Sequence, residues 1–230
     1  MGTNPRYNET WQDRFGELRC FMQSLNSIPI PSVPISSFFD DNADFRPAQI
    51  RWNRDEYYKM AELGFFDGKR VELIEGEIIE MAPMGSPHIT CIMILGRLLT
   101  DVFSKGYCVR TQGTLDLGLK SQPEPDAAVV AGALRDYADA HPKSAVLIVE
   151  VSDTTLSLDR TFKAAIYARN SIEDYWIVNL QHRCVEIYRK PVQDSNLGFI
   201  YSERTVIGEK ESVSPLAKPK AKIKVADILP

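Results

Sequence analysis

A run of apolar residues that ends in a carboxylate constrains this chain more than any other feature. Residues 145–149 read Ala-Val-Leu-Ile-Val, and Glu150 follows them directly. The run is too uniformly apolar for a strand with one face in water, so it predicts a central strand buried on both faces. By the two-residue alternation of strands, Glu150 shares a face with Ile148 and Ser152. A carboxylate there needs a cation or hydrogen-bond donors, and Glu150 is therefore either half of a structural salt bridge or part of a functional site.

The other apolar patterns predict a mixed sheet with helices packed against it. Helices are expected at residues 54–64, 86–105 and 159–170, and strands at 70–81, 107–112, 114–119, 125–131, 144–152, 174–180 and 184–189, with one more after 199. Gly76 marks a hairpin turn or bulge within 70–81, and Ser86 followed by Pro87 is typical of a helix start. This order of elements predicts an α/β or α+β fold, a mixed β-sheet flanked by helices.

Periodicity also assigns apolar faces to the three helices. The first has Tyr57, Met60, Ala61 and Leu63 on its apolar side; the second carries Ile89, Met93, Leu98, Leu99, Val102 and Phe103. The third, with Asp159 as its cap, is expected to turn Phe162, Ala165, Ile166 and Tyr167 inward.

The first 48 residues differ in pattern from the rest of the chain. Apolar residues at helical spacing predict an amphipathic helix over residues 10–25, and the prolines that alternate with Ile and Val over residues 28–35 indicate extended chain. We therefore expect residues 1–48 to form an N-terminal appendage and residues 49–230 to form the main domain. The appendage shows no pattern typical of catalysis.

Composition limits the classes of function. The 27 Lys and Arg residues against 31 Asp and Glu give a net charge of −4, which argues against a broadly basic nucleic-acid coat but not against a local basic groove. No apolar run approaches the about 18–20 residues of a membrane helix, and the first thirty residues lack a signal-peptide stretch. The four cysteines form no CxxC pair, so we expect neither a zinc site nor a disulfide framework. This cysteine usage is typical of a cytoplasmic protein, which we expect here.

A second carboxylate stands at the start of another predicted strand. Pro125 cannot donate a hydrogen bond to a strand ladder, so it belongs at a strand start and leaves Asp126 at the strand mouth. A simple turn aspartate is the alternative. Two acidic residues on neighbouring strands, as Asp126 and Glu150 would be, can hold a divalent cation, and Mg²⁺ is usually held by one or two carboxylates with waters and substrate phosphate.

Lys163 follows the Glu150 strand and lies in the first turns of the third predicted helix. There it could bring its ammonium next to the two carboxylates, where it would orient or activate a water or neutralise charge that develops on a phosphate. An ordinary solvated helix lysine is the alternative.

Several segments together resemble a known family. They are Val71–Glu77, Pro125-Asp126, Val149–Asp153, Leu158–Lys163 with Tyr167–Arg169, and Asp174–Leu180. In their order and spacing they resemble the Uma2 family, restriction-endonuclease-like proteins of the PD-(D/E)xK nuclease superfamily. The resemblance covers about residues 50–228, nearly all of the chain except the appendage. It implies a restriction-endonuclease-like fold and activity on DNA.

The resemblance also implies roles for single residues. Asp126 is similar to the aspartate of the PD signature and Glu150 to the acidic residue of (D/E)xK. Where that signature has lysine, this chain has Ser152; in Uma2-like members the lysine lies on the following helix, at the position of Lys163. Glu72 matches the glutamate of the family's first strand motif and would complete the acidic cluster, although the pattern does not settle which way it faces.

Other polar and aromatic residues also allow a functional and a structural interpretation. His88 matches a histidine of similar family members and either faces the cluster as a proton carrier or phosphate contact, or bonds local backbone. Gln112 is a weaker candidate for substrate binding. Turn or cap roles are expected for Asp153, Asp159 and Asn179, core packing for Tyr175, Trp176 and Tyr188, and a solvated edge strand for the lysines of 218–224.

These observations favour a Mg²⁺- or Mn²⁺-dependent DNA endonuclease in which Asp126 and Glu150 bind the metal and Glu72 and Lys163 complete the catalytic set. We expect a homodimer, since cutting both DNA strands is simplest with two sites. Two alternatives stay open: a nuclease-like fold retained as a binding or oligomerisation module without turnover, and an unrelated hydrolase that uses two carboxylates without metal, such as a glycosidase.

Overall fold

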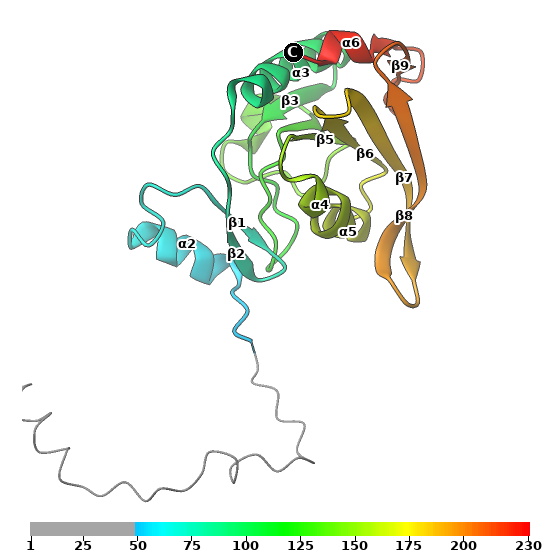
Figure 1. Cartoon of the computed structure of the whole chain (residues 1–230). Coiled ribbons are helices and arrows are strands. Elements are labelled where there is room, and N and C mark those ends of the chain that lie inside the picture. Colours follow the sequence, from blue (N-terminus) through cyan, green and yellow to red (C-terminus); the bar gives the residue numbers. More distant parts are fainter. Residues whose placement is uncertain (1–48) are drawn as a thin grey trace, which may run out of the picture. The chain divides into compact units, whose positions relative to one another are not determined.

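Six strands form the main sheet, in the order β3-β4-β5-β6-β7-β8 (Figure 1). The computed structural model describes residues 49–230, so the helix expected over 10–25 and the extended segment after it lie outside the described residues. Neighbouring strands are antiparallel except β5 and β6, which are parallel. The strands are β3 (Tyr107–Thr111), β4 (Ala127–Ala131), β5 (Leu147–Ser152), β6 (Asp174–Asn179), β7 (Cys184–Asp194) and β8 (Gly198–Gly208). This mixed α+β architecture is the predicted one.

The apolar run before Glu150 forms the central strand that its composition predicts. All six residues of β5 are buried, and β5 lies between β4 and β6. Because β5 and β6 are parallel, the chain must cross over between them, and a helical segment makes this crossover. The strand that carries Glu150 therefore leads directly into the helix that carries Lys163.

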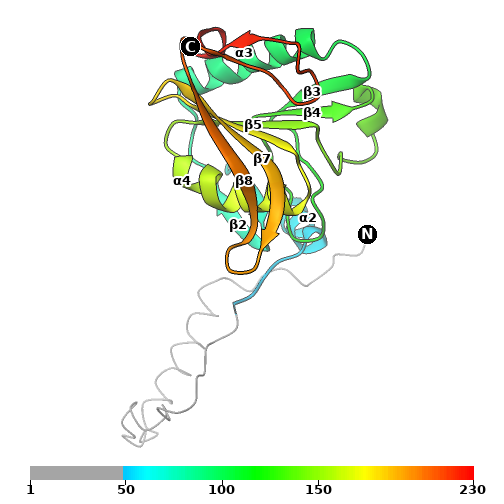
Figure 2. The same cartoon turned by 90° about the vertical axis from the view of Figure 1, so that its right-hand side faces the viewer.

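Helices cover the two faces of the sheet (Figure 2). One face packs against α3 (Ser86–Val102) and the C-terminal α6 (Val225–Ile228), with Val149, Trp176 and Leu95 in its core. The other packs against α5 (Ala164–Arg169), with Ile148, Ile177 and Ile166 in its core. Glu150 has the parity of Ile148 and thus belongs to the α5 side. Tyr175, Trp176 and Tyr188 are buried, as predicted.

A separate hairpin, β1 (Val71–Ile74) and β2 (Glu77–Glu80), carries Glu72. Glu75 and Gly76, with φ of 51° and 80°, form the tight turn that the sequence predicts at Gly76. The amide of Gln122 donates to the carbonyl of Leu73 at 2.8 Å, which ties the hairpin to the segment before β4. The helix before it, α2 (Arg54–Glu62), begins at the capping box of Asn53 and Glu56.

Three predicted elements differ from the structure. Residues 114–119 are not a strand, because this segment turns back on itself, with the amide of Leu115 donating to Pro123 and that of Leu117 to Ser121. The cap of α3 is Gly85, one residue earlier than predicted. The lysines of 218–224 form no edge strand of the main sheet; only Lys224 belongs to a strand, in the pair β9 (Ser212–Val213) and β10 (Ile223–Lys224).

The predicted apolar faces are also partly wrong. In α2 only Tyr57 is buried, while Leu63 is exposed because the helix lies at the surface. In α3 the buried residues are Cys91, Ile92, Leu95 and Leu99, and Ile89 and Met93 point to solvent. No helix of the described part of the chain is long and apolar enough to cross a membrane.

The crossover segment is one helical stretch of three parts: α4 (Leu156–Leu158), a π-helical turn η3 (Asp159–Lys163), and α5. It begins before Asp159, which is therefore not its cap but a buried residue that accepts a hydrogen bond from the Thr155 hydroxyl at 2.7 Å. A π-helical turn holds more residues than an α-helical one and so shifts the phase of the faces. As a result Phe162, which the periodicity predicts to face inward, is exposed, and Lys163 points inward.

Candidate active site

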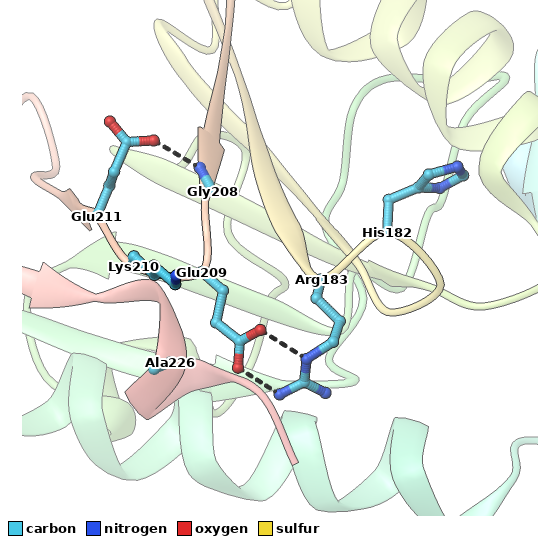
Figure 3. A pocket seen from close by; sticks show the side chains of 7 residues that line it. All are labelled: His182, Arg183, Gly208, Glu209, Lys210, Glu211 and Ala226. Carbon is cyan, nitrogen blue, oxygen red and sulfur yellow. Dashed lines mark hydrogen bonds and ion pairs between the residues drawn. The ribbon is translucent and has the colours of Figure 1, made fainter.

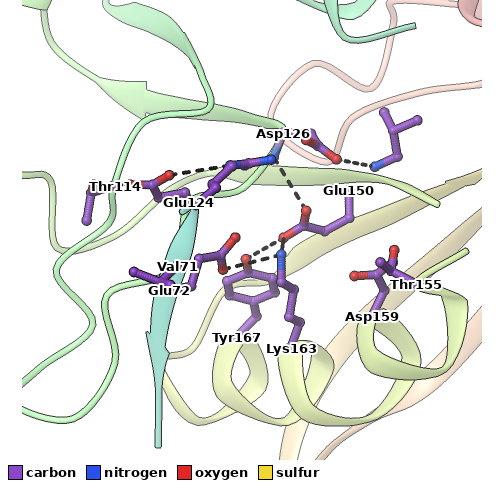
Figure 4. A network of polar contacts seen from close by, with 12 residues as sticks. Val71, Glu72, Thr114, Glu124, Asp126, Glu150, Thr155, Asp159, Lys163 and Tyr167 are labelled. Carbon is purple, nitrogen blue, oxygen red and sulfur yellow. Dashed lines mark hydrogen bonds and ion pairs between the residues drawn. The ribbon is translucent and has the colours of Figure 1, made fainter. Parts of the chain in front are cut away.

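Asp126 and Glu150 lie side by side at the mouth of neighbouring strands (Figure 4). The register pairs Ala127 with Val149, which places Asp126 opposite Glu150 one step further along. The amide of Asp126 faces Oε2 of Glu150 at 3.4 Å, and the amide of Val151 donates to Oδ2 of Asp126 at 2.9 Å. The two strands thus position each other's carboxylate through main-chain donors.

The crossover helix brings two donors to Glu150. Lys163 Nζ lies 3.1 Å from Oε1 of Glu150, and the hydroxyl of Tyr167 donates to the same oxygen at 2.6 Å. All three side chains are buried. The lysine that the sequence places on the helix therefore reaches the acidic residue of the strand, and the solvated-lysine alternative is wrong.

Glu72 enters the cluster from β1. Its Oε2 is 3.5 Å from Lys163 Nζ, so the ammonium lies between the carboxylates of Glu72 and Glu150. Glu72 is fully buried, and no donor in the described part of the chain makes a hydrogen bond to either of its carboxylate oxygens. A buried carboxylate with so few partners is costly, and only a nearby positive charge compensates it.

Burial and mutual charge shift the ionisation of the cluster. Burial raises the pKa of Glu150, and the ammonium of Lys163 opposes that rise. For Lys163, burial favours the neutral amine, but the carboxylates of Glu150 and Glu72 outweigh it and raise the pKa. The acidic neighbours thus favour the ammonium form of Lys163, whereas burial makes Glu150 harder to ionise than an exposed carboxyl.

His88 and Gln112 differ in their relation to this cluster. His88, in the first turn of α3, places Nε2 at 3.2 Å from Oδ2 of Asp126, so its partner is the cluster and not local backbone. Gln112 has φ of 50°, and its exposed side chain donates to the sulfur of Met84 at 3.0 Å. Gln112 adjoins the site only through its main chain, whose amide donates to the carbonyl of Asp126 at 3.2 Å.

The remaining candidates have structural places. Ser152 is buried, and its parity in β5 puts it on the same face as Glu150. Asn179 accepts a hydrogen bond from the amide of His182 at 3.0 Å, which is the turn role predicted for it. Asp153 follows the end of β5 and its carbonyl accepts from Gln181 at 2.7 Å.

Sequence reasoning missed three residues near the site: Tyr167, Asp159 and Glu124. The spacing of Asp159, Lys163 and Tyr167, four residues apart each time, was the available signal, because residues four apart share a helix face. Burial and the charge of Glu72 raise the pKa of Glu124, which shows that these two glutamates are electrostatic neighbours. No pattern in the sequence points to that pair.

The donor set of the cluster suits a hard cation. Asp126 and Glu150 offer carboxylate oxygens, and Glu72 is a buried carboxylate to which no described residue donates a hydrogen bond. Within residues 49–230, however, no three His, Cys, Asp or Glu side chains converge as a ready-made metal cage. Mg²⁺ fits such a site, because it needs only one or two carboxylates and takes its other ligands from water and phosphate.

A surface pocket at the end of β8 lies apart from the cluster (Figure 3). Arg183 and Glu209 form a two-pronged ion pair at its wall, with distances of 2.8 and 2.7 Å. The charges of Arg183 and Glu209 therefore compensate each other. None of the cluster residues lines this pocket, so the pocket is separate from the cluster around Glu150.

Comparison with known proteins identifies a family and a similar fold. No curated protein matches the chain. Among solved structures, it is similar to the crystal structure of a "putative nuclease belonging to DUF820" from Anabaena variabilis ATCC 29413, with 14% sequence identity over 79% of this chain and 97% of that chain and a TM-score of 0.59. At that identity the likeness shows a shared fold and nothing more. The family model described as "Uma2: Putative restriction endonuclease" matches residues 54–225, and the chain thus belongs to the Uma2 family.

Proposed function

We propose that this protein is a Mg²⁺-dependent endodeoxyribonuclease that hydrolyses phosphodiester bonds of DNA, with Mn²⁺ as an effective replacement. The observation that carries the proposal is that buried Glu150 contacts both the main-chain amide of Asp126, at the start of β4, and Nζ of Lys163 on the crossover helix. Membership of a family of restriction-endonuclease-like proteins supports the same reaction class.

Each residue of the cluster has a role in this proposal. Asp126 and Glu150 would hold the cation, which when bound polarises the scissile phosphate and lowers the pKa of a water. Lys163 positions the attacking water or neutralises charge that develops on the phosphate. Glu72 holds the ammonium of Lys163 from the far side. His88 contacts Oδ2 of Asp126 and fixes the direction of that carboxylate.

Titration calorimetry with Mn²⁺ and Mg²⁺ tests the metal site. We expect the wild-type chain to bind the cation and Asp126→Asn to lose most of that binding, because the substitution removes a charged ligand while keeping the shape of the side chain. Asp139→Asn is the matched control, since Asp139 is an exposed aspartate outside the cluster. Equal binding by wild type and Asp126→Asn would dismiss the proposed site.

One observation favours a second candidate, a nuclease fold that binds DNA without turnover. Glu72, Glu150 and Lys163 are at most 3% exposed, and the ammonium already compensates both carboxylates. Fluorescence anisotropy with labelled duplex DNA separates the two candidates: binding without cleavage in Mg²⁺ would favour the second. The homodimer stays a prediction, which sedimentation velocity of the full chain would check.

A further inference from the structure

We propose that Tyr167 is a positioning residue that holds one oxygen of Glu150 so that the other oxygen faces the cation. The inference rests on the proposed function and names a part of the site that lies outside the metal ligands. It follows from how donors divide between the two oxygens of one buried carboxylate (Figure 4).

The division is unequal. Oε1 of Glu150 accepts from the Tyr167 hydroxyl at 2.6 Å and from Lys163 Nζ at 3.1 Å. Oε2 has, among the described residues, one long contact, the amide of Asp126 at 3.4 Å. Two strong donors thus occupy Oε1, while Oε2 faces only the main-chain amide of Asp126 among the described residues and keeps room for a further partner. If a cation were bound, Glu150 would have Oε2 to offer it, while Oε1 stays with Tyr167 and Lys163.

Tyr167, like Tyr188 with Glu186, donates to a side-chain carboxylate, whereas the buried Tyr175 and the half-buried Tyr201 donate to main chain. The hydroxyl of Tyr175 donates to the main-chain carbonyl of Asp159 at 3.0 Å, and that of Tyr201 to the carbonyl of Ile172 at 2.8 Å. Those acceptors are already fixed by the backbone. The partner of Tyr167 is instead a side chain that would rotate if it were not held. The Tyr167 hydroxyl therefore restricts the rotation of the Glu150 side chain, a proposed metal ligand, in addition to making its own hydrogen bond.

The ring and the hydroxyl of Tyr167 have separable roles. The ring packs edge-on against Tyr175, with centroids 5.0 Å apart, and belongs to the core on the α5 side of the sheet. Tyr167→Phe keeps that packing and removes only the hydroxyl. Groups that orient a metal ligand from behind typically change metal affinity by about 10–100-fold when they are removed.

The test is Mn²⁺ titration calorimetry on wild type, Tyr167→Phe and Tyr201→Phe, after circular dichroism has matched their folds. Tyr201→Phe is the control, because it deletes a hydroxyl whose acceptor is main chain. We expect Tyr167→Phe to bind Mn²⁺ about 10–100-fold more weakly and Tyr201→Phe to bind like wild type. We also expect a higher Mg²⁺ concentration to restore cleavage by Tyr167→Phe, which a merely structural defect would not allow.

The outcomes separate this inference from the proposed function. Wild-type binding that Tyr167→Phe leaves unchanged overturns the role of Tyr167 and leaves the metal site standing. Equal weakening by both Tyr→Phe variants also overturns it, since the effect would then be general loss of packing. If the wild-type chain itself binds no Mn²⁺, the proposed metal site is wrong and the role of Tyr167 falls with it.

Discussion

Lys163 Nζ lies 3.1 Å from Oε1 of Glu150, although the two residues are 13 positions apart and belong to a helix and a strand. The parallel pairing of β5 and β6 explains the contact, because it forces a crossover directly after β5 and lays the crossover helix on the face of Glu150. Ser152, two residues after Glu150 on the same face, stands where the superfamily signature has its lysine. In this chain Lys163 on the helix supplies the ammonium instead.

Lys163→Met tests what the ammonium contributes to folding. The variant would leave Glu72 and Glu150 buried without their shared cation, and removing one partner of a buried ion pair costs about 3–5 kcal/mol. We expect urea denaturation at neutral pH to show a loss of that size. Lys143→Met, at an exposed lysine, should stay within about 0.5 kcal/mol of wild type. A Lys163→Met chain as stable as wild type would contradict the argument.

Much of the site could be predicted from the sequence because its three main residues lie next to strong patterns. Glu150 ends a run whose uniform apolarity places it in the centre of the sheet, and Asp126 follows a proline that fixes a strand start. Lys163 was placed by the order of strand and helix. The inferences for Glu150 and Asp126 depend on local sequence, whereas that for Lys163 also needed the two carboxylates and the resemblance to the Uma2 family. The structure confirms the contact of Lys163 with Glu150.

What could not be predicted depends on how elements meet. Glu72 lies on a hairpin outside the main sheet, so alternation along its strand does not say which side meets the cluster. Tyr167 fits an apolar helix face; its spacing of four residues from Lys163 puts the two on one side of the helix, but it does not show that the hydroxyl reaches a residue of another element. Phe162 was predicted to be inward because regular helical periodicity does not anticipate a π-helical turn.

Removal of divalent cations should abolish DNA cleavage. We expect purified wild-type protein to nick or linearise supercoiled plasmid in Mg²⁺, to stop in excess EDTA, and to resume when Mg²⁺ is restored, because the proposed ion polarises the scissile phosphate. Glu150→Gln should fail under all three conditions, which shows that the cleavage belongs to this protein and not to a contaminant. Full cleavage in EDTA would favour a hydrolase that uses its two carboxylates without metal.

Glu186, a buried carboxylate outside the cluster, predicts a pH dependence of stability. Burial alone would raise its pKa, but hydrogen bonds from two arginines, a tyrosine and an asparagine lower the pKa to about 2 (Arg160, Tyr188, Asn179 and Arg204). A carboxyl with a lowered folded-state pKa stabilises the fold above its unfolded-state pKa, near 4.5. That stabilisation is lost as the pH falls from about 4.5 toward about 2.

Glu186→Gln should therefore be less stable than wild type at pH 7 and approach it in acid. Because both arginines are partly exposed, we expect a modest difference of about 1–2 kcal/mol at pH 7 after solvent screening. Urea denaturation of both proteins between pH 7 and pH 3 measures it. A difference that stays constant over this range would show that the ionised carboxylate of Glu186 contributes nothing.

The last prediction concerns the turn that holds Glu72. Gly76 has φ of 80°, and a Cβ added there would lie 3.0 Å from Cβ of Arg51 and 3.1 Å from the carbonyl oxygen of Trp52. The turn is also fastened by main-chain bonds, since the amide of Trp52 donates to Gly76 and the amide of Gly76 to Lys120, both at 2.8 Å. Gly76→Ala should thus carry both a backbone penalty and a steric one.

Gly68→Ala separates these two penalties. Gly68 has φ of 75° but nothing within 4 Å of an added Cβ, so its substitution carries the left-handed backbone penalty alone, about 1–2 kcal/mol. We expect Gly76→Ala to cost at least about 1 kcal/mol more, as crowding in packed regions does. We also expect Gly76→Ala, but not Gly68→Ala, to slow DNA cleavage, because a displaced turn would shift β1, the strand that leads into it, and move Glu72 away from Lys163. Equal costs for the two alanines would mean that the hairpin yields to the added methyl group and does not fix Glu72.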